Sequence, residues 1–171
     1  MEVKKMLKQE QIDEAIQRIN NNEILILPTD TIYGLSARYD HSNEIRINGL
    51  KNADLEKPLI ILISDIKQAE MFAHIDESIS EILNSVQPTT VVFGNGVNTF
   101  GVRKVLREDL VKIISETGPI YSTSVNFSGN KPLRTQDELA NFSEEVTLFF
   151  DEILNGQPSR IYNSITKEWI R

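Results

Sequence analysis

The segment of residues 59–63, Leu-Ile-Ile-Leu-Ile, constrains the fold more than any other part of this chain. It is an unbroken aliphatic run that directly follows Pro58. A strand with one face in water alternates apolar and polar residues, whereas a strand buried on both faces shows no such alternation. We therefore expect a fully buried strand here, of the kind that parallel strands form in α/β proteins.

The rest of the chain alternates between helical and extended patterns with short connections. Ile12, Ala15 and Ile19 recur at helical spacing, which predicts an amphipathic helix over residues 10–20. Ser42 is a candidate cap for a second helix. Further helices are expected over 75–86, over 110–117 and from the capping box at 135–138, and further strands over 24–27, 89–93, 101–104, 120–124, 146–150 and 160–165. This order predicts one α/β domain over residues 1–171 with a mixed sheet.

Composition excludes several classes of site. The chain has no cysteine, so disulfides and thiolate metal sites are absent, and His41 and His74 are expected on the surface because neither has metal-ligand spacing to another candidate. No apolar run approaches the ~20 residues of a membrane-spanning helix. The net charge of −7 opposes binding to nucleic-acid phosphates. We expect a cytoplasmic protein without a metal site of its own, without membrane contact and without stable nucleic-acid binding.

Three polar segments follow predicted strands, where ligands of α/β proteins collect. Neither GxxxxGK[ST] nor GxGxxG is present, so a nucleotide would be held in another way. Residues 28–35 (PTDTIYGL) are either a tight turn or a ligand loop. Lys51 and Lys57 are either solvated charges or cations that neutralise a polyphosphate. Ser122, Ser124 and Asn126 share one face of a strand, which is either a satisfied polar face or a binding surface.

Taken together and in this order, the three segments resemble the YrdC family, known as TsaC in bacteria. The similarity runs through ILILPTDTIYGL, LKNADLEKPLIILIS, FGVRKV, IYSTSVNFSGNKP and, more weakly, PSRIYNSITKEWIR. The family consists of threonylcarbamoyl-AMP synthases that act in tRNA modification. The resemblance implies a YrdC-like fold, in which a twisted mixed β-sheet with flanking helices surrounds an open, positively lined cleft.

The resemblance also implies the substrates L-threonine, bicarbonate and ATP, with Mg²⁺ bridging the phosphates. The threonylcarbamoyl-adenylate would pass to a downstream threonylcarbamoyl transferase complex. Carried over by position, Thr31 and Ser122 contact threonine and Arg103 pairs with its carboxylate, for which a guanidinium fork is suited. Ser159 matches a more remote position that contacts threonine or ATP.

The remaining carried-over residues belong to the ATP side. Lys51 and Lys57 match positions near the phosphates, and Ser124 and Asn126 match nucleotide-binding positions. Arg171 matches a more remote ATP-contacting position. The protein then has to hold its reactants in line and balance their charge, with little covalent chemistry of its own.

One departure from the family pattern concerns a cation. The chain has Ala53 where the family usually carries an arginine, two residues after the lysine. The possible substitutes are Arg38, Arg46, Arg107 and Lys131. If none of them replaces the arginine, the chain is instead a catalytically impaired nucleotide- or RNA-binding module of the same fold.

Overall fold

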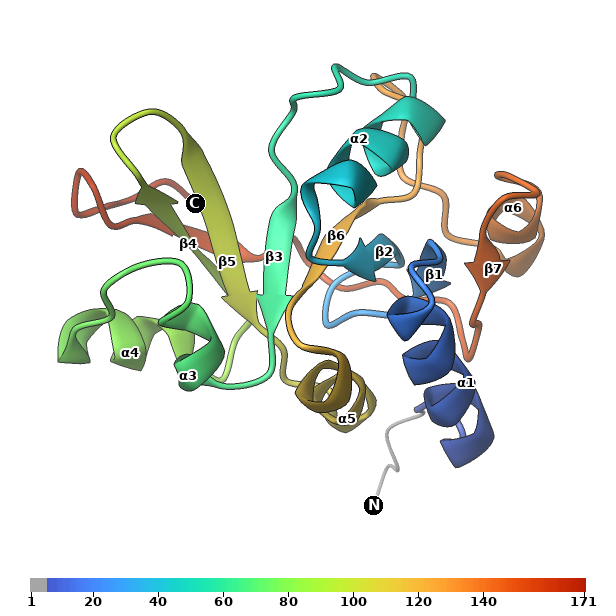
Figure 1. Ribbon diagram of the computed structural model, residues 1–171, viewed down its shortest axis with the longest axis horizontal. Coiled ribbons are helices and arrows are strands. Elements are labelled where there is room, and N and C mark those ends of the chain that lie inside the picture. Colours follow the sequence, from blue (N-terminus) through green and yellow to red (C-terminus); the bar gives the residue numbers. More distant parts are fainter. Residues whose placement is uncertain (1–5) are drawn as a thin grey trace.

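The structure is a computed structural model that describes residues 6–171; residues 1–5 of the expected domain lie outside the described residues. Its strands are β1 Leu25–Leu27, β2 Gly34–Arg38, β3 Ile60–Ile63, β4 Thr89–Gly94, β5 Thr99–Lys104, β6 Ile120–Ser124, β7 Thr147–Leu148, β8 Arg160–Asn163 and β9 Glu168–Trp169. Over the described residues these strands form one twisted sheet in the order β7-β1-β2-β6-β3-β5-β4-β8-β9 (Figure 1). The expected mixed α/β architecture is confirmed.

Strand β3 occupies the middle of this sheet. It runs parallel to β5 and antiparallel to β6, and Ile61, Leu62 and Ile63 are each at most 3% exposed. The unbroken aliphatic run therefore predicted its position correctly. Parallel pairs also join β1 to β7 and β4 to β8, and antiparallel pairs join the other neighbours.

Helices cover both faces of the sheet. The helices are α1 Gln9–Asn20, α2 His41–Leu50, α3 Ile66–Ala69, α4 Glu77–Leu83, α5 Glu108–Thr117 and α6 Gln136–Ala140. Leu62 packs in the apolar cluster of α1 and α5, whereas Ile61 and Ile63 pack in the cluster that includes Ile47 of α2 and Leu83 of α4. This split follows from the alternation of side chains along a strand. Over residues 6–171, no helix is both long and apolar enough to cross a bilayer.

Most predicted helices and strands are present, but several begin or end at other residues than predicted. The helix expected over 75–86 is only α4, because the chain turns at residues 85–88 and leaves Val86 90% exposed. The strand expected over 146–150 is only the two-residue β7. The cap assigned to Ser42 was wrong: Asp40 is the N-cap of α2, and its carboxylate accepts a hydrogen bond from the Ser42 backbone N–H at 2.9 Å. Strand β2 was not predicted, because it begins inside PTDTIYGL.

Candidate active site

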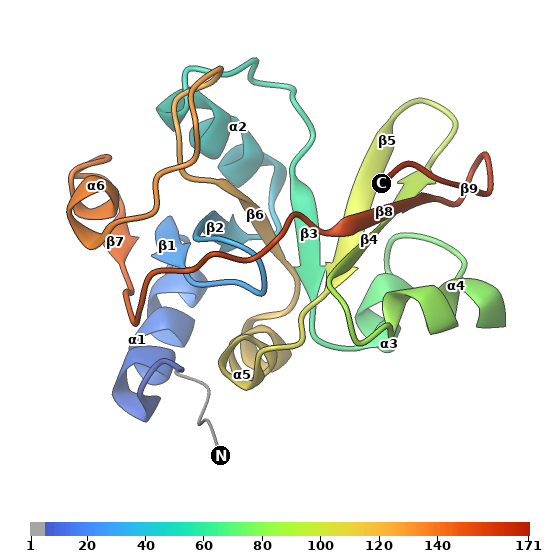
Figure 2. The same ribbon diagram turned by 180° about the vertical axis from the view of Figure 1, so that it is seen from behind.

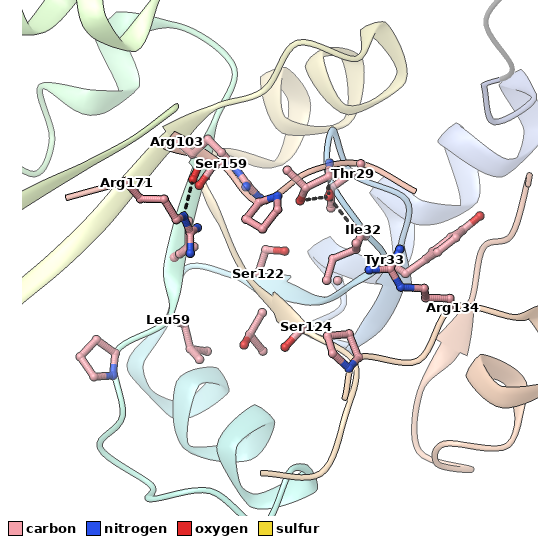
Figure 3. A pocket seen from close by; sticks show the side chains of 18 residues that line it. Thr29, Ile32, Tyr33, Leu59, Arg103, Ser122, Ser124, Arg134, Ser159 and Arg171 are labelled. Carbon is pink, nitrogen blue, oxygen red and sulfur yellow. Dashed lines mark hydrogen bonds between the residues drawn. The ribbon is translucent and has the colours of Figure 1, made fainter. Parts of the chain in front are cut away.

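A cleft opens on the face of the sheet that carries α1 and α5. Its volume is about 440 Å³, and its walls come from the loop before β2, from β3, β5 and β6, and from the chain after β6. Its other walls are the chain end at Arg171 and the segment 149–159, here called the strap. Figure 2 shows the strap crossing this face on its way from β7 to β8. Figure 3 shows the side chains that face the cleft.

A row of hydroxyl groups on β6 forms the floor of the cleft. Ser122 and Ser124 alternate along the strand and line the cleft together, as predicted from their spacing. Gly34 lies beside Ser122, and a Cβ at Gly34 would stand 2.3 Å from the Ser122 Oγ. Gly34 is not among the positive-φ glycines of the described chain. The glycine of PTDTIYGL therefore leaves room for the Ser122 hydroxyl in its present position, and it is not needed for a left-handed turn.

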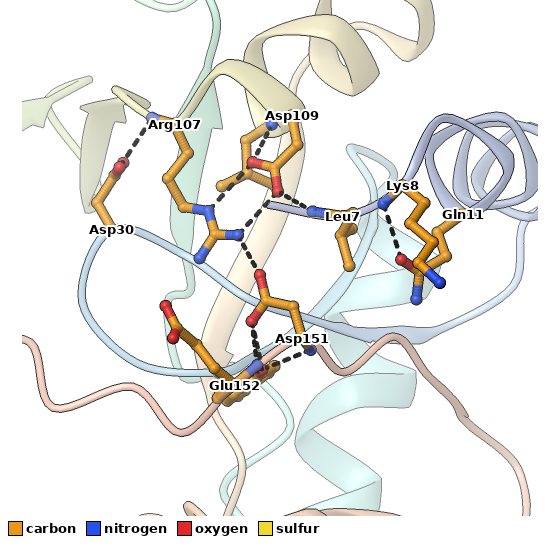
Figure 4. A network of polar contacts seen from close by, with 10 residues as sticks. Leu7, Lys8, Gln11, Asp30, Arg107, Asp109, Asp151 and Glu152 are labelled. Atoms are coloured by element: carbon orange, nitrogen blue, oxygen red, sulfur yellow. Dashed lines mark hydrogen bonds and ion pairs between the residues drawn. The ribbon is translucent and has the colours of Figure 1, made fainter. Parts of the chain in front are cut away.

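The threonines of PTDTIYGL face the cleft, whereas its aspartate does not. Thr29 and Thr31 are buried, line the cleft and share a 3.2 Å contact between their Oγ1 atoms. The Asp30 carboxylate accepts hydrogen bonds from the backbone N–H groups of Leu106 and Arg107, both at 2.9 Å (Figure 4). These hydrogen bonds anchor the loop to the start of α5. Asp30 points away from the cleft, and Thr29 and Thr31 face it.

Arg103 of β5 brings a buried positive charge to the cleft. The side chain is 6% exposed, and its Nε has no hydrogen-bond partner within residues 6–171. Burial lowers the pKa of Arg103, the charge of Asp30 opposes that shift, and Arg171 adds to it. A buried cation with an unused N–H group is costly unless an anion binds to it. Arg103 is therefore suited to hold a carboxylate or phosphate.

Ser159 and Arg171 stand at the same end of the cleft as Arg103 (Figure 3). The Ser159 hydroxyl lies 2.8 Å from that of Thr90, and the Arg171 Nε donates to the Ser159 carbonyl at 2.9 Å. Ser159 is buried, and Arg171 is exposed. These two residues, predicted from the weakest part of the similarity, are both brought to the cleft by β8 and the chain end.

Lys51 reaches the hydroxyl row from the C-terminal end of α2. It is 4% exposed, and its Nζ donates to the Thr123 hydroxyl at 2.9 Å and approaches the Ser124 hydroxyl at 3.4 Å. Burial, together with repulsion from Lys57, lowers the pKa of Lys51 to about 8. Its interpretation as a solvated surface charge is therefore wrong.

Asn126 is hydrogen-bonded to Ser124 of the hydroxyl row. Its Oδ1 accepts from the Ser124 hydroxyl at 2.6 Å, and its Nδ2 donates to the carbonyls of Phe127 and Asn130. The side chain is 9% exposed and does not line the cleft. Asn126 therefore orients Ser124 and shapes the turn after β6.

Lys57 is exposed and precedes Pro58, which lines the cleft rim. Its backbone is held by Asn48 of α2, a fully buried residue whose Nδ2 donates to the carbonyls of Lys57 at 2.8 Å and Leu55 at 3.3 Å. The Asn48 Oδ1 is buried without a partner in the described chain. Sequence reasoning missed Asn48, because its partners are backbone atoms that no side-chain pattern reveals.

The cations proposed to replace an arginine at position 53 do not line the cleft. Arg107 forms ion pairs with Asp109 at 2.8 Å and Asp151 at 2.7 Å (Figure 4). Burial alone would lower the pKa of Arg107, but its hydrogen bonds to these two carboxylates raise it. Arg46 donates to the Asn22 carbonyl and to the Asn43 side chain.

The other two proposed cations are also remote from the cleft walls. Arg38 ends β2 opposite Ile120, at the far end of β6 from Ser124, and Lys131 is exposed. Arg134 does line the cleft and was missed, although it follows STSVNFSGNKP by only two residues. Its Nη1 donates to the Leu154 carbonyl of the strap at 3.3 Å.

The strap approaches the threonine loop too closely for any residue but glycine. The Gly156 N–H donates to the Thr31 carbonyl at 3.1 Å, and a Cβ at Gly156 would stand 2.3 Å from that oxygen. We expect Gly156→Ala to destabilise the protein by about 1–3 kcal/mol, because backbone has to move. Thermal unfolding measures the effect. Gly49→Ala in α2 is the control, since its nearest neighbour would be Leu55 at 3.9 Å; equal melting temperatures for both variants would contradict the packing.

In the described part of the chain, the cleft is lined by Arg103, Arg134 and Arg171 and by no carboxylate side chain. Over the same residues, no group of three or more His, Cys, Asp or Glu side chains is placed to hold a metal ion. The mixed sheet and this cleft define an α/β protein with a cationic, hydroxyl-lined cleft that is suited to an anionic ligand.

The family model for Sua5, YciO and YrdC proteins, described as "Telomere recombination", matches residues 17–171. The chain therefore belongs to the Sua5/YciO/YrdC family, and the predicted resemblance is confirmed. It is 26% identical to a threonylcarbamoyl-AMP synthase of Pseudoalteromonas translucida, over 97% of this chain and 100% of that protein. A threonylcarbamoyl-AMP synthase of Buchnera aphidicola is 27% identical, over 90% of this chain and 98% of the relative.

Solved structures share the fold. Sua5 of P. abyssi complexed with L-threonine superimposes with a TM-score of 0.79 at 25% identity, over 96% of this chain and 53% of that one. The chain thus spans about half the length of P. abyssi Sua5. YciO of E. coli has a TM-score of 0.75 at 16% identity, over 95% of this chain and 91% of YciO, which supports the fold alone.

Proposed function

We propose that this chain is a threonylcarbamoyl-AMP synthase, a nucleotidyltransferase that converts L-threonine, bicarbonate and ATP into threonylcarbamoyl-adenylate, pyrophosphate and water. The observation that carries the proposal is the buried Arg103, which has an unused N–H group and lines the same cleft as the hydroxyl row of β6. Relatives that match over nearly their whole length bear this name. The product would pass to a threonylcarbamoyl transferase complex, and the enzyme would work in the cytoplasm.

In this proposal the threonine lies at the buried end of the cleft. Arg103 pairs with its carboxylate, and Thr31 and Ser122 bind its polar groups, with Ser159 close to the same end. The threonine amine takes up carbon dioxide from bicarbonate to give a carbamate. Because Arg103 fixes the carboxylate, the carbamate has a defined direction in which to attack, and orientation of this kind is a large part of catalysis in such reactions.

The ATP in this proposal extends from the hydroxyl row toward the rim. A carbamate oxygen attacks the α-phosphorus, the bond to the bridging oxygen breaks, and pyrophosphate leaves with that oxygen. Lys51 and Lys57 neutralise the charge that develops on the phosphates, Arg171 contacts the nucleotide, and Ser124, oriented by Asn126, binds it. Since the cleft supplies cations and hydroxyls, a Mg²⁺ ion would arrive on the ATP phosphates as part of the substrate.

The test is pyrophosphate release with threonine, bicarbonate, ATP and Mg²⁺. We expect turnover that requires all four, and omission of threonine or bicarbonate should reduce it to background. Pyrophosphate release that ignores threonine or bicarbonate would refute the proposed reaction.

A second candidate is a nucleotide- or RNA-binding module of the same fold that has lost catalysis, and Ala53 is the observation that favours it. Tight ATP binding without pyrophosphate release would support this candidate. The RNA version requires binding that weakens steeply with salt, and the net charge of −7 opposes it.

We expect Ala53→Arg to raise kcat/KM for ATP, because the new guanidinium adds a cation near Lys51. The comparison is Arg134→Gln, which removes an arginine of the cleft wall and should raise the KM for ATP. If Ala53→Arg changes nothing in the native chain but restores the activity of Arg134→Gln, then Arg134 already supplies the missing charge. Steady-state kinetics at varied ATP measures both variants.

We expect Asn48→Leu to raise the KM for ATP about 3- to 10-fold, because it removes hydrogen bonds of about 0.5–1.5 kcal/mol each to the carbonyls of Lys57 and Leu55, which hold the loop that carries Lys57. Leucine has the same branched arrangement of side-chain heavy atoms and removes the unpartnered Oδ1, so the melting temperature should change little. The KM for threonine is the internal control. An equal rise in both KM values would show that Asn48 supports the whole cleft and not the Lys57 loop.

A further inference from the structure

A second cavity, of about 670 Å³, opens on the opposite face of the sheet from the cleft. Alternation along β3 and β6 separates the two: Ile60 and Ser122 line the cleft, whereas their neighbours Ile61 and Tyr121 line the second cavity. Its walls come from the start of α2, from the turn after α3, from the β4–β5 hairpin and from β3 and β6. The two cavities share only Pro58 and Leu59 in their linings, so a ligand of the second cavity would bind mostly to other residues than those of the cleft.

Aromatic rings form a continuous wall in this cavity, which we call the aromatic pocket. Tyr39 lies edge-on to Phe72 with ring centroids 4.9 Å apart, and Tyr39 and Tyr121 are 5.1 Å apart. Phe72 and Phe100 continue the wall at 6.4 Å. Tyr39 remains 43% exposed, so part of this wall is accessible to a ligand.

The aromatic pocket has the opposite charge to the cleft. It is lined by the carboxylates Glu44 of α2 and Glu56 of the loop before β3, and by no lysine or arginine of the described chain. Neither carboxylate takes part in an ion pair within residues 6–171. Burial raises the pKa of Tyr121, and the charge of Glu44 raises it further, so the tyrosine stays neutral. The basic group in the lining is His41.

We propose that the aromatic pocket binds an alkylammonium ion, with its charge between Glu44 and Glu56 and its carbon chain against Tyr39 and Phe72. Ammonium groups are attracted to the faces of aromatic rings, and a carboxylate pair strengthens the attraction. The ammonium group would come from a free diamine or from a lysine side chain of a partner protein. The proposal does not depend on the reaction in the cleft.

The experiment is an NMR titration of the whole chain with cadaverine, with uncharged 1,5-pentanediol as the isosteric control. We expect saturable shifts at Tyr39, Phe72 and Tyr121 with a Kd of about 1 mM, and no such shifts with the diol. Nα-acetyl-lysine amide tests the second source: tighter binding than cadaverine would identify a protein side chain, and weaker binding a free diamine.

Two variants test which carboxylate binds the ammonium group. Glu44→Gln should weaken cadaverine binding at least about fivefold, since the remaining contacts are uncharged or at the rim. Glu145→Gln, an exposed carboxylate outside the pocket, should leave binding unchanged. Thermal melting checks that both variants are folded. Equal shifts with the diol, shifts confined to the cleft, or the same affinity in Glu44→Gln would overturn the proposal.

Discussion

Replacing Arg103 by methionine should reduce threonine-dependent pyrophosphate release about 100- to 1,000-fold, the size of effect seen when one charged contact is lost from a desolvated site. The loss should appear mainly as a raised KM for threonine, because Arg103 is proposed to hold the threonine carboxylate. Since a carboxylate that is not fixed also misdirects the carbamate, kcat should fall too. Steady-state kinetics at saturating ATP measures both parameters.

The same variant should be at least as stable as the native chain. Arg103 is 6% exposed and its Nε has no partner in the described chain, so its charge is buried at a cost. Replacement of a buried charge by an apolar side chain of similar volume is often neutral or stabilising. Asp30 keeps its two backbone hydrogen bonds. Activity and stability should therefore move in opposite directions, which a general packing defect would not produce.

Arg46→Met is the matched control, since it removes an exposed arginine that does not line the cleft. Its kinetics should match those of the native chain. Arg103→Lys keeps the charge but loses the fork and should recover only part of the activity. If the KM for threonine in Arg103→Met stays within about threefold of the native value, Arg103 does not hold the carboxylate of the substrate threonine.

Sequence alone predicted those parts of the fold that local patterns encode. The run 59–63 predicted the central strand because burial on both faces leaves a direct signature in composition. The strand at 120–124 matched β6, and the capping box at Thr135 began α6. Strand β2 was missed because its polar and glycine residues are paired with β6 through tertiary contacts that no local pattern records.

The site was predictable where side chains face the ligand and less so where backbone atoms do the positioning. Thr31, Ser122, Ser124, Arg103 and the chain end all reach one cleft, as the family resemblance implied. Lys51 does not line the cleft wall, but its Nζ contacts the Ser124 hydroxyl of the row. The roles of Gly156 and Asn48 depend on carbonyl oxygens that approach from elsewhere in the chain, so no sequence pattern indicates them.

Lys51→Met should reduce kcat/KM for ATP about 100-fold, because it removes the ammonium group that contacts Ser124 at the proposed phosphate position. The native chain should also show a pH dependence. Its affinity for ATP should fall as the pH rises through about 8, because the buried amine of Lys51 then loses its proton and its positive charge. Phosphate contact favours the charged form, so ATP binding just above that pH should take up a proton. Calorimetry in buffers of different ionisation enthalpy measures the uptake, and Lys51→Met should abolish it.

The stability of the native chain should change over the same range. The pKa of Lys51 is about 8 in the folded chain, whereas an ordinary exposed lysine has a pKa of 10.5, so the unfolded chain binds more protons between these pH values. Stability therefore rises with pH across this interval, and the cost of burying the ammonium is fully present below it. Lys51→Met should be more stable than the native chain at pH 7, with a smaller difference at pH 10, as measured by urea unfolding. A difference that does not depend on pH would mean that Lys51 is not buried as an ammonium, and the proton uptake on ATP binding should then be absent as well.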